Sequence, residues 1–143
     1  MENKIRTAWF VLAVSIFAIA IPLFAASSSK KPLPDLAVTS IKITSSEVSG
    51  KVVIAFTVTN KGDKASPSSK TQIVLDEHDP NVIATRNAPS LLPGRTYADR
   101  VEYTVSKNNK YVFKATADYN NRVPEGNDLN NSNTVSFSFG RSF

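Results

Sequence analysis

Side chains that offer oxygen atoms are concentrated in residues 118–131, where three carboxylates alternate with Asn residues. Calcium takes about six to eight oxygen ligands, and carboxylate and amide oxygens are its usual protein donors. One interpretation of this stretch is therefore a calcium site. Its candidate ligands are Asp118, Asn120, Glu125, Asp128 and Asn130.

A second interpretation assigns these side chains to the backbone of the loop itself. The spacing of an EF-hand loop is absent, because Arg122 stands where the third ligand would be. Asn and Asp side chains commonly bond nearby backbone groups and so fix the shape of a turn. Asn130 and Asn131 would then hold the entry to the next strand. The sequence leaves both interpretations open.

The single histidine, His78, lies among three acidic residues in the segment 76–79. Adjacent residues rarely converge on one ion, and transition metals usually require more than one His or Cys ligand. The segment is therefore interpreted as a solvated turn. The chain has no Cys, and it lacks GxSxG, HExxH and Gly-rich phosphate motifs. We predict no catalytic residues, no enzyme activity and no cofactor apart from the calcium alternative.

Short strands are the elements that must position these residues. Apolar and polar residues alternate in several runs, most clearly in 51–60, which is typical of strands with one buried face. The predicted strands are residues 35–44, 51–60, 71–76, 81–85, 97–105, 111–118 and 133–139. About seven short strands without helices between them predict an all-β, two-sheet antiparallel β-sandwich of immunoglobulin type. Its predicted core is Leu36, Ile54, Phe56, Val58, Ile73, Leu75, Val101, Tyr103, Phe113, Val135 and Phe137.

Local departures from alternation predict a bulge and several turns. The apolar phase of the first strand changes after Val38, which indicates a bulge near Ser40. Asn60 and Gly62 mark a tight turn, in which Gly supplies a positive φ and Asn tolerates one. Gly94 marks another turn after Leu91.

The N-terminus predicts export. Residues 1–7 carry two basic groups, residues 8–26 carry no charge, and small residues follow. This pattern is typical of a secretory signal peptide, and the uncharged run is also long enough for an uncleaved membrane anchor helix. We expect residues 1–26 to be one or the other, 27–34 a linker, 35–139 the sandwich and 140–143 a tail. The sandwich is then periplasmic, extracellular or at the cell surface.

The sandwich resembles the CARDB domain, a bacterial and archaeal family named for its association with cell adhesion. The resemblance extends over about residues 34–139. The matching motif residues are Pro34, Asp35, Leu36, Asn60, Lys61, Gly62, Leu91, Gly94, Ala117, Asp118, Asn120, Asn121, Val123, Glu125, Asp128, Asn130 and Asn131. It implies an immunoglobulin-like sandwich and a non-catalytic binding or adhesion module. The implied partner is a cell-surface protein or polysaccharide.

Charge and edge strands limit the remaining possibilities. The chain has 17 basic and 12 acidic residues, a net charge of +5. The basic residues are scattered and are not interleaved with aromatic residues, which argues against nucleic-acid binding. Membrane contact is expected only through residues 1–26, if they are not cleaved. The alternative function is a self-assembling structural or accessory subunit of the cell envelope or surface, a homo-oligomer joined through unpaired edge strands or the N-terminal segment.

Overall fold

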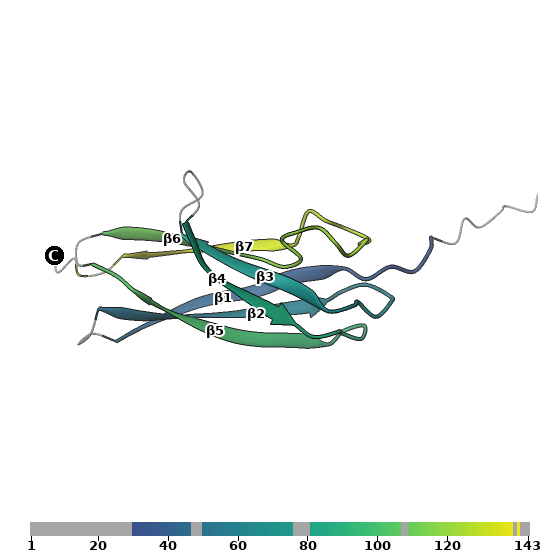
Figure 1. Ribbon diagram of the computed structural model, residues 1–143, viewed down its shortest axis with the longest axis horizontal. Helices are drawn as coiled ribbons and strands as arrows, with labels where there is room; N and C mark the ends of the chain where they lie inside the picture. The colour runs from purple at the N-terminus through teal and green to yellow at the C-terminus, as the bar shows by residue number, and fades with distance from the viewer. Residues whose placement is uncertain (1–29, 47–49, 76–80, 107–108, 139, 141–143) are drawn as a thin grey trace, which may run out of the picture.

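The computed structural model describes residues 30–46, 50–75, 81–106, 109–138 and 140. The strands are β1 (Leu36–Ser46), β2 (Lys51–Asn60), β3 (Ser69–Leu75), β4 (Asn81–Ala88), β5 (Thr96–Thr104), β6 (Lys110–Thr116) and β7 (Ser132–Ser138). They form a sheet of order β1-β2-β5 and a sheet of order β4-β3-β6-β7, with every pairing antiparallel (Figure 1). The predicted seven-strand, two-sheet antiparallel sandwich is confirmed.

The described part of the chain contains no helix, and so none that is long and apolar enough to span a membrane. The predicted export helix within residues 1–26 lies outside the described residues. Most strand boundaries differ from the prediction by one to three residues: the first strand extends to Ser46 and the third begins at Ser69. The fourth strand extends to Ala88, and the sixth ends at Thr116, two residues before Asp118.

The core lies between the two sheets and follows the alternation of the sequence. In β2 the side chains of Val52, Ile54, Phe56 and Val58 are buried, and their neighbours are more exposed. Seven predicted core residues are buried, and the other four are partly buried and pack against them: Leu75, Tyr103, Val135 and Phe137. Leu91 and Val123 join the core from loops, which strand alternation could not indicate.

The predicted irregularity in the first strand is confirmed. The register of β1 against β2 shifts between Val38 and Ser40. Because of this bulge, Val38 and Ile41 are both buried although they are three residues apart.

Each sheet has two edge strands, so the sandwich has two seams where edges of opposite sheets meet. β1 lies against β7 along one seam, and Asn133 Nδ2 donates to Val38 O across it (3.3 Å). β4 lies near β5 along the other. Figure 1 shows residues 61–68, 89–95 and 117–131 at one end of the sandwich, where the described chain also begins. We call this the loop end.

Candidate functional site

The loop 117–131 is held at its base by Asp118, which is 3% exposed and has a φ of 40°. Asp118 Oδ2 accepts a hydrogen bond from Val123 N (2.7 Å), and Val123 is buried in the core. Ala117 N donates to Asn131 O at the opposite side of the base (2.8 Å). Asp118 is therefore one reason why this polar loop has a fixed shape.

The same loop docks onto the chain entering β1. Gly126 N donates to Pro34 O (2.8 Å), and Leu36 N donates to Glu125 Oε2 (2.7 Å). Asn130 Nδ2 donates to Asp35 Oδ1 (2.9 Å). These bonds join segments about ninety residues apart in sequence, so they close the loop end of the β1–β7 seam.

The Glu125 carboxyl lies where a negative charge is unfavourable. Burial is the main cause that raises the pKa of this carboxyl to about 7, although the hydrogen bond from Leu36 N opposes the change. The nearby carboxylates of Asp118, Asp128 and Asp35 raise the pKa further. Glu125 therefore titrates close to neutral pH.

Three of the five candidate calcium ligands are engaged in hydrogen bonds within the protein. Glu125 is bonded to Leu36 N, Asp118 to Val123 N, and Asn130 to Asp35 through its Nδ2. Among the described residues, no group of three or more acidic or His side chains is placed to hold a metal. The engaged carboxylates are those the second interpretation requires, and calcium binding stays a prediction. His78 and its acidic neighbours lie outside the described residues.

The turn residues act differently from the prediction. Asn60 is fully buried, and its Nδ2 donates to Lys64 O and Leu91 O (both 2.8 Å). Its Oδ1 accepts from Asp35 N (3.1 Å) and Gly62 N (3.0 Å). Asn60 is thus the centre of the hydrogen bonds beneath the loop end.

The predicted positive φ at Gly62 was wrong, since the positive-φ glycines are Gly50, Gly94 and Gly140. Glycine is required at position 62 for space, because a Cβ would collide with the backbone of Leu33 and Pro34. Gly94, at a φ of 74°, fits its predicted turn.

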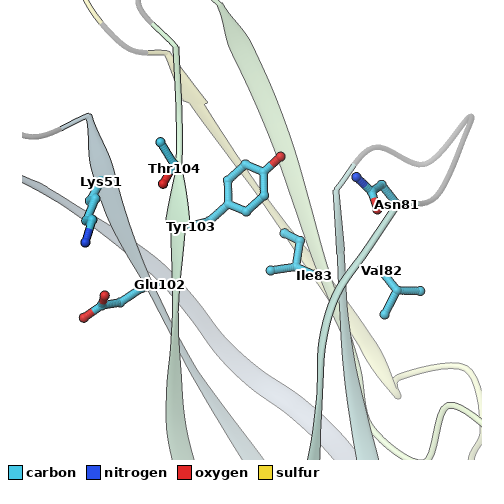
Figure 2. A pocket seen from close by; sticks show the side chains of 7 residues that line it. All are labelled: Lys51, Asn81, Val82, Ile83, Glu102, Tyr103 and Thr104. Atoms are coloured by element: carbon cyan, nitrogen blue, oxygen red, sulfur yellow. The ribbon is translucent and has the colours of Figure 1, made fainter.

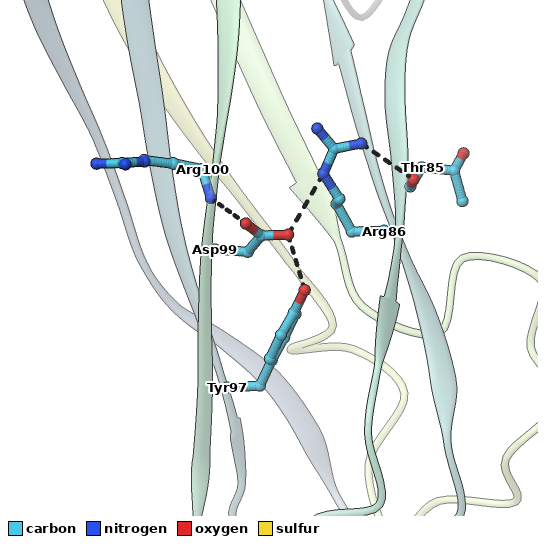
Figure 3. A network of polar contacts seen from close by, with 5 residues as sticks. All are labelled: Thr85, Arg86, Tyr97, Asp99 and Arg100. Carbon is cyan, nitrogen blue, oxygen red and sulfur yellow. Dashed lines mark hydrogen bonds and ion pairs between the residues drawn. The ribbon is translucent and has the colours of Figure 1, made fainter.

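The β4–β5 seam is crossed by a small polar network (Figure 3). Asp99 Oδ2 accepts from Tyr97 OH (2.8 Å) and lies 3.3 Å from Arg86 Nε. The Arg86 and Asp99 side chains are 40% and 30% exposed. Burial, followed by the hydrogen bond to Asp99 and its charge, raises the pKa of Tyr97 to about 12.

A cleft of about 530 Å³ opens along the same seam. Figure 2 shows Tyr103 from β5 and Ile83 from β4 pointing into the space between the strands. The remaining lining residues are Lys51, Asn81, Val82, Glu102 and Thr104. The edge strands β4 and β5 therefore do not pair with each other here. The backbone groups along the outer edge of each strand form no hydrogen-bond ladder with another described strand.

A second, smaller pocket of about 230 Å³ lies where β3, β4 and the loop 117–131 meet. Tyr119 N donates to Lys70 O (3.2 Å), which ties the loop to the start of β3. We call this the end pocket. It is lined by Ser68, Ser69, Lys70, Asn87, Asp118, Asn120 and Arg122.

One wall of the end pocket is a chain of three side chains. With the Asn120 amide oriented so that both its atoms are satisfied, Nδ2 donates to Asp118 Oδ1 (3.2 Å) and Oδ1 accepts from Arg122 Nε (3.0 Å). Asp118 thus holds Asn120, and Asn120 holds the guanidinium. Sequence reasoning missed this pocket, because its residues come from three separate segments and form no local motif.

Comparison with known proteins decides the family. The CARDB family model matches residues 33–135, which is most of the chain. The chain belongs to the CARDB family. A CARDB domain from Pyrococcus furiosus, crystallised in complex with di-metal ions, is 24% identical, with a TM-score of 0.64 over 78% of this chain and 97% of that one. Its solution structure gives 27% identity and a TM-score of 0.61, over 76% and 97% of the two chains.

A further structural neighbour is a domain of a protein from Methanosarcina acetivorans that is named as a cell surface protein. It is 25% identical, with a TM-score of 0.64 over 77% of this chain and 95% of that one. No curated protein matches the chain. CARDB is a cell-surface-associated family of non-catalytic modules.

Proposed function

We propose that this CARDB protein is an exported, non-catalytic module that binds a cell-surface polysaccharide or protein. The observation that carries the proposal is the end pocket, whose walls are held by the buried Asp118 and by the bond between Tyr119 and Lys70. Several of its side chains offer hydrogen-bonding groups without a partner of their own. A prepared, polar concavity on a rigid scaffold is a usual form of binding site.

Family membership supports a binding role over a catalytic one. The described part of the chain contains no His and no Cys, and its perturbed carboxyl, Glu125, is bonded to backbone inside the loop. The N-terminal sequence supports export, and the scattered basic residues do not favour nucleic acid.

The test uses the protein in the form its own cells export. It is incubated with isolated cell envelopes, and with polysaccharides and proteins extracted from them, and bound protein is separated by sedimentation. Saturable binding to an extracted component is the expected result. Failure to bind intact envelopes and every extract would overturn the proposal.

The β4–β5 seam supports a second candidate, a self-assembling subunit. The outer edges of β4 and β5 pair with no other strand among the described residues, and the cleft between them exposes 52% of Val82. Free edges can accept a strand from another copy. Sedimentation velocity over a wide concentration range tests this candidate, and a monomer at the highest concentration would eliminate it.

A further inference from the structure

We infer that the end pocket binds an acidic sugar residue, with Arg122 and Lys70 contacting the carboxylate of the sugar. This inference rests on the proposed binding function and narrows it from surface polymers in general to those that carry carboxylates.

The end pocket contains two cations, Lys70 and Arg122, that form no ion pair with a described residue. Among the described residues, no carboxylate lies within ion-pair distance of Lys70 or Arg122. The only carboxylate in the lining is that of Asp118, which is buried and accepts bonds from Val123 and Asn120. Two cations against one engaged carboxylate leave a positive pocket, which favours an anion.

Arg122 is held in a way that suits a planar anion. The side chain is exposed, and the bond from its Nε to Asn120 restrains the guanidinium, while its terminal N–H groups have no partner among the described residues. An Arg fork binds a carboxylate through two parallel hydrogen bonds, and fixing the fork beforehand reduces the entropy lost on binding.

Hydroxyl and amide groups complete the lining. Ser69 is 7% exposed, and its Oγ is buried without a hydrogen-bond partner. Ser68 and Asn87 offer further polar groups that no other described residue occupies. Ser69 and its partner Ala88 face the core, whereas Lys70 and its partner Asn87 face solvent, so the Ser69 hydroxyl lies behind the pocket and not within reach of a ligand. No aromatic side chain lines the pocket, so charge-assisted hydrogen bonds must supply the affinity.

The size of the pocket sets the length of ligand that it can hold. At about 230 Å³ it is smaller than the range of roughly 300–1,000 Å³ that is usual for drug-sized ligands. It therefore suits one residue of a polymer, with the neighbouring residues outside. A single contact of this kind is weak, and repeated residues on the polymer or several copies of the protein would strengthen it.

The probe is a fluorescent oligogalacturonide, and the matched neutral ligand is the same oligosaccharide with its carboxylates methyl-esterified. We expect the exported protein to bind the acid and to bind the ester at least about tenfold more weakly, since the loss of one charge-assisted bond costs about 1.4 kcal/mol or more. Arg122→Gln and Lys70→Gln should each weaken binding of the acid about tenfold. Lys42→Gln removes the same charge from an exposed site on β1 and should leave affinity unchanged.

Ser69→Ala tests on which side of β3 the ligand binds. Removing a buried hydroxyl without a partner should leave the melting temperature unchanged or raise it, and affinity for the acid should not change, because Ser69 faces the core. A severalfold loss of affinity in Ser69→Ala would show that the ligand binds on the core side of β3 and would overturn the inference.

The remaining outcomes distinguish failure of the acidic-sugar inference from failure of the proposed binding function. Equal losses in Lys42→Gln and Arg122→Gln would show attraction by overall charge and overturn the inference. Equal binding of acid and ester would also overturn it. Binding to envelopes without binding to the acid would overturn the inference and leave the proposed function intact. Binding to neither would overturn both.

Discussion

The two seams of this sandwich are closed by different means. At the loop end of the β1–β7 seam, the loop 117–131 is joined to the chain entering β1 by three hydrogen bonds. Glu125 accepts one from the backbone N–H of Leu36, and Gly126 donates one to the backbone carbonyl of Pro34. The β4–β5 seam is bridged by Arg86 and Asp99, both partly exposed, and beside them a cleft stays open.

This difference indicates which side of the sandwich stabilises the fold and which side is accessible to a partner. Breaking a buried hydrogen bond leaves a polar group unsatisfied, at a cost of about 1–3 kcal/mol, whereas an exposed ion pair contributes about 0–1 kcal/mol. The β1–β7 side and the loop end should therefore resist change and can support the end pocket. The β4–β5 side should tolerate change, and it is the side where the proposed self-assembly would add strands.

The largest expected effect is at Asn60, beneath the loop end. Asn60→Ala removes four hydrogen bonds. It leaves the Asp35 amide without its partner, and the Leu91 carbonyl keeps only the bond from Ser66 N. We expect the free energy of unfolding to fall by about 3–5 kcal/mol. Urea denaturation of the wild type and the variant measures the loss.

Asn127→Ala is the matched control for Asn60. Asn127 is exposed, and its Oδ1 accepts only the local bond from Leu129 N (3.1 Å). We expect a loss within about 0.5 kcal/mol, as for most surface changes. If the two variants lost similar amounts of stability, the buried bonds of Asn60 would not be what secures this end.

A smaller effect is expected from Glu125, and it depends on pH. Its folded-state pKa of about 7 lies above the ordinary 4.5, so the folded protein binds the proton more tightly than the unfolded chain does. The contribution of this group to stability is fully present below pH 4.5 and is lost as the pH rises to about 7. Because Glu125 is only half-buried, we expect this loss to be roughly 1 kcal/mol.

Glu125→Gln removes this titration, and its amide oxygen can still accept from Leu36 N. The bond from Asn131 Nδ2 to Oε1 (3.4 Å) is lost at every pH, so it adds only a constant difference. The difference in unfolding free energy between variant and wild type should grow in favour of the variant between pH 4.5 and 7.5. Urea denaturation at four pH values in this range measures it. A difference that stays constant with pH would show that the fold does not disfavour the ionised form of Glu125.

The sequence predicted the strands and their buried faces better than the side-chain contacts between distant segments. Alternation in β2 and the phase change at Val38 are local signals, and both correctly predicted structure. The partners of Glu125 and Asn130 depend on how distant segments meet, and no local pattern carries that information. For the same reason, Arg122 was visible only as an interruption of a calcium motif, whereas in the fold it forms a wall of the end pocket.

At the β4–β5 seam we expect a small change in stability and a clear spectroscopic one. Asp99→Asn removes the charge that Arg86 faces and weakens the acceptor of the Tyr97 hydroxyl. Stability should change by less than about 1 kcal/mol, because the pair is partly exposed. The pKa of Tyr97 should fall from about 12 toward its ordinary 10, while burial still raises it.

Phenolate absorbance during alkaline titration measures this pKa, with Tyr97→Phe identifying the signal. A stability loss as large as that of Asn60→Ala would contradict the distinction between the two seams. A Tyr97 pKa unchanged in Asp99→Asn would show that Asp99 does not determine it.

The smallest expected effect is that of calcium. A site with a dissociation constant of about 1 mM, as in extracellular modules, would add about 1.4 kcal/mol at about 10 mM calcium, which is several degrees in melting temperature. We expect a shift near zero in the wild type, because Asp118 and Glu125 already hold the loop through backbone N–H groups. Magnesium at the same concentration controls for ionic strength. A calcium-specific shift of several degrees that Asp128→Asn abolished would restore the calcium site, and it would mean that the loop exchanges its own hydrogen bonds for metal ligands.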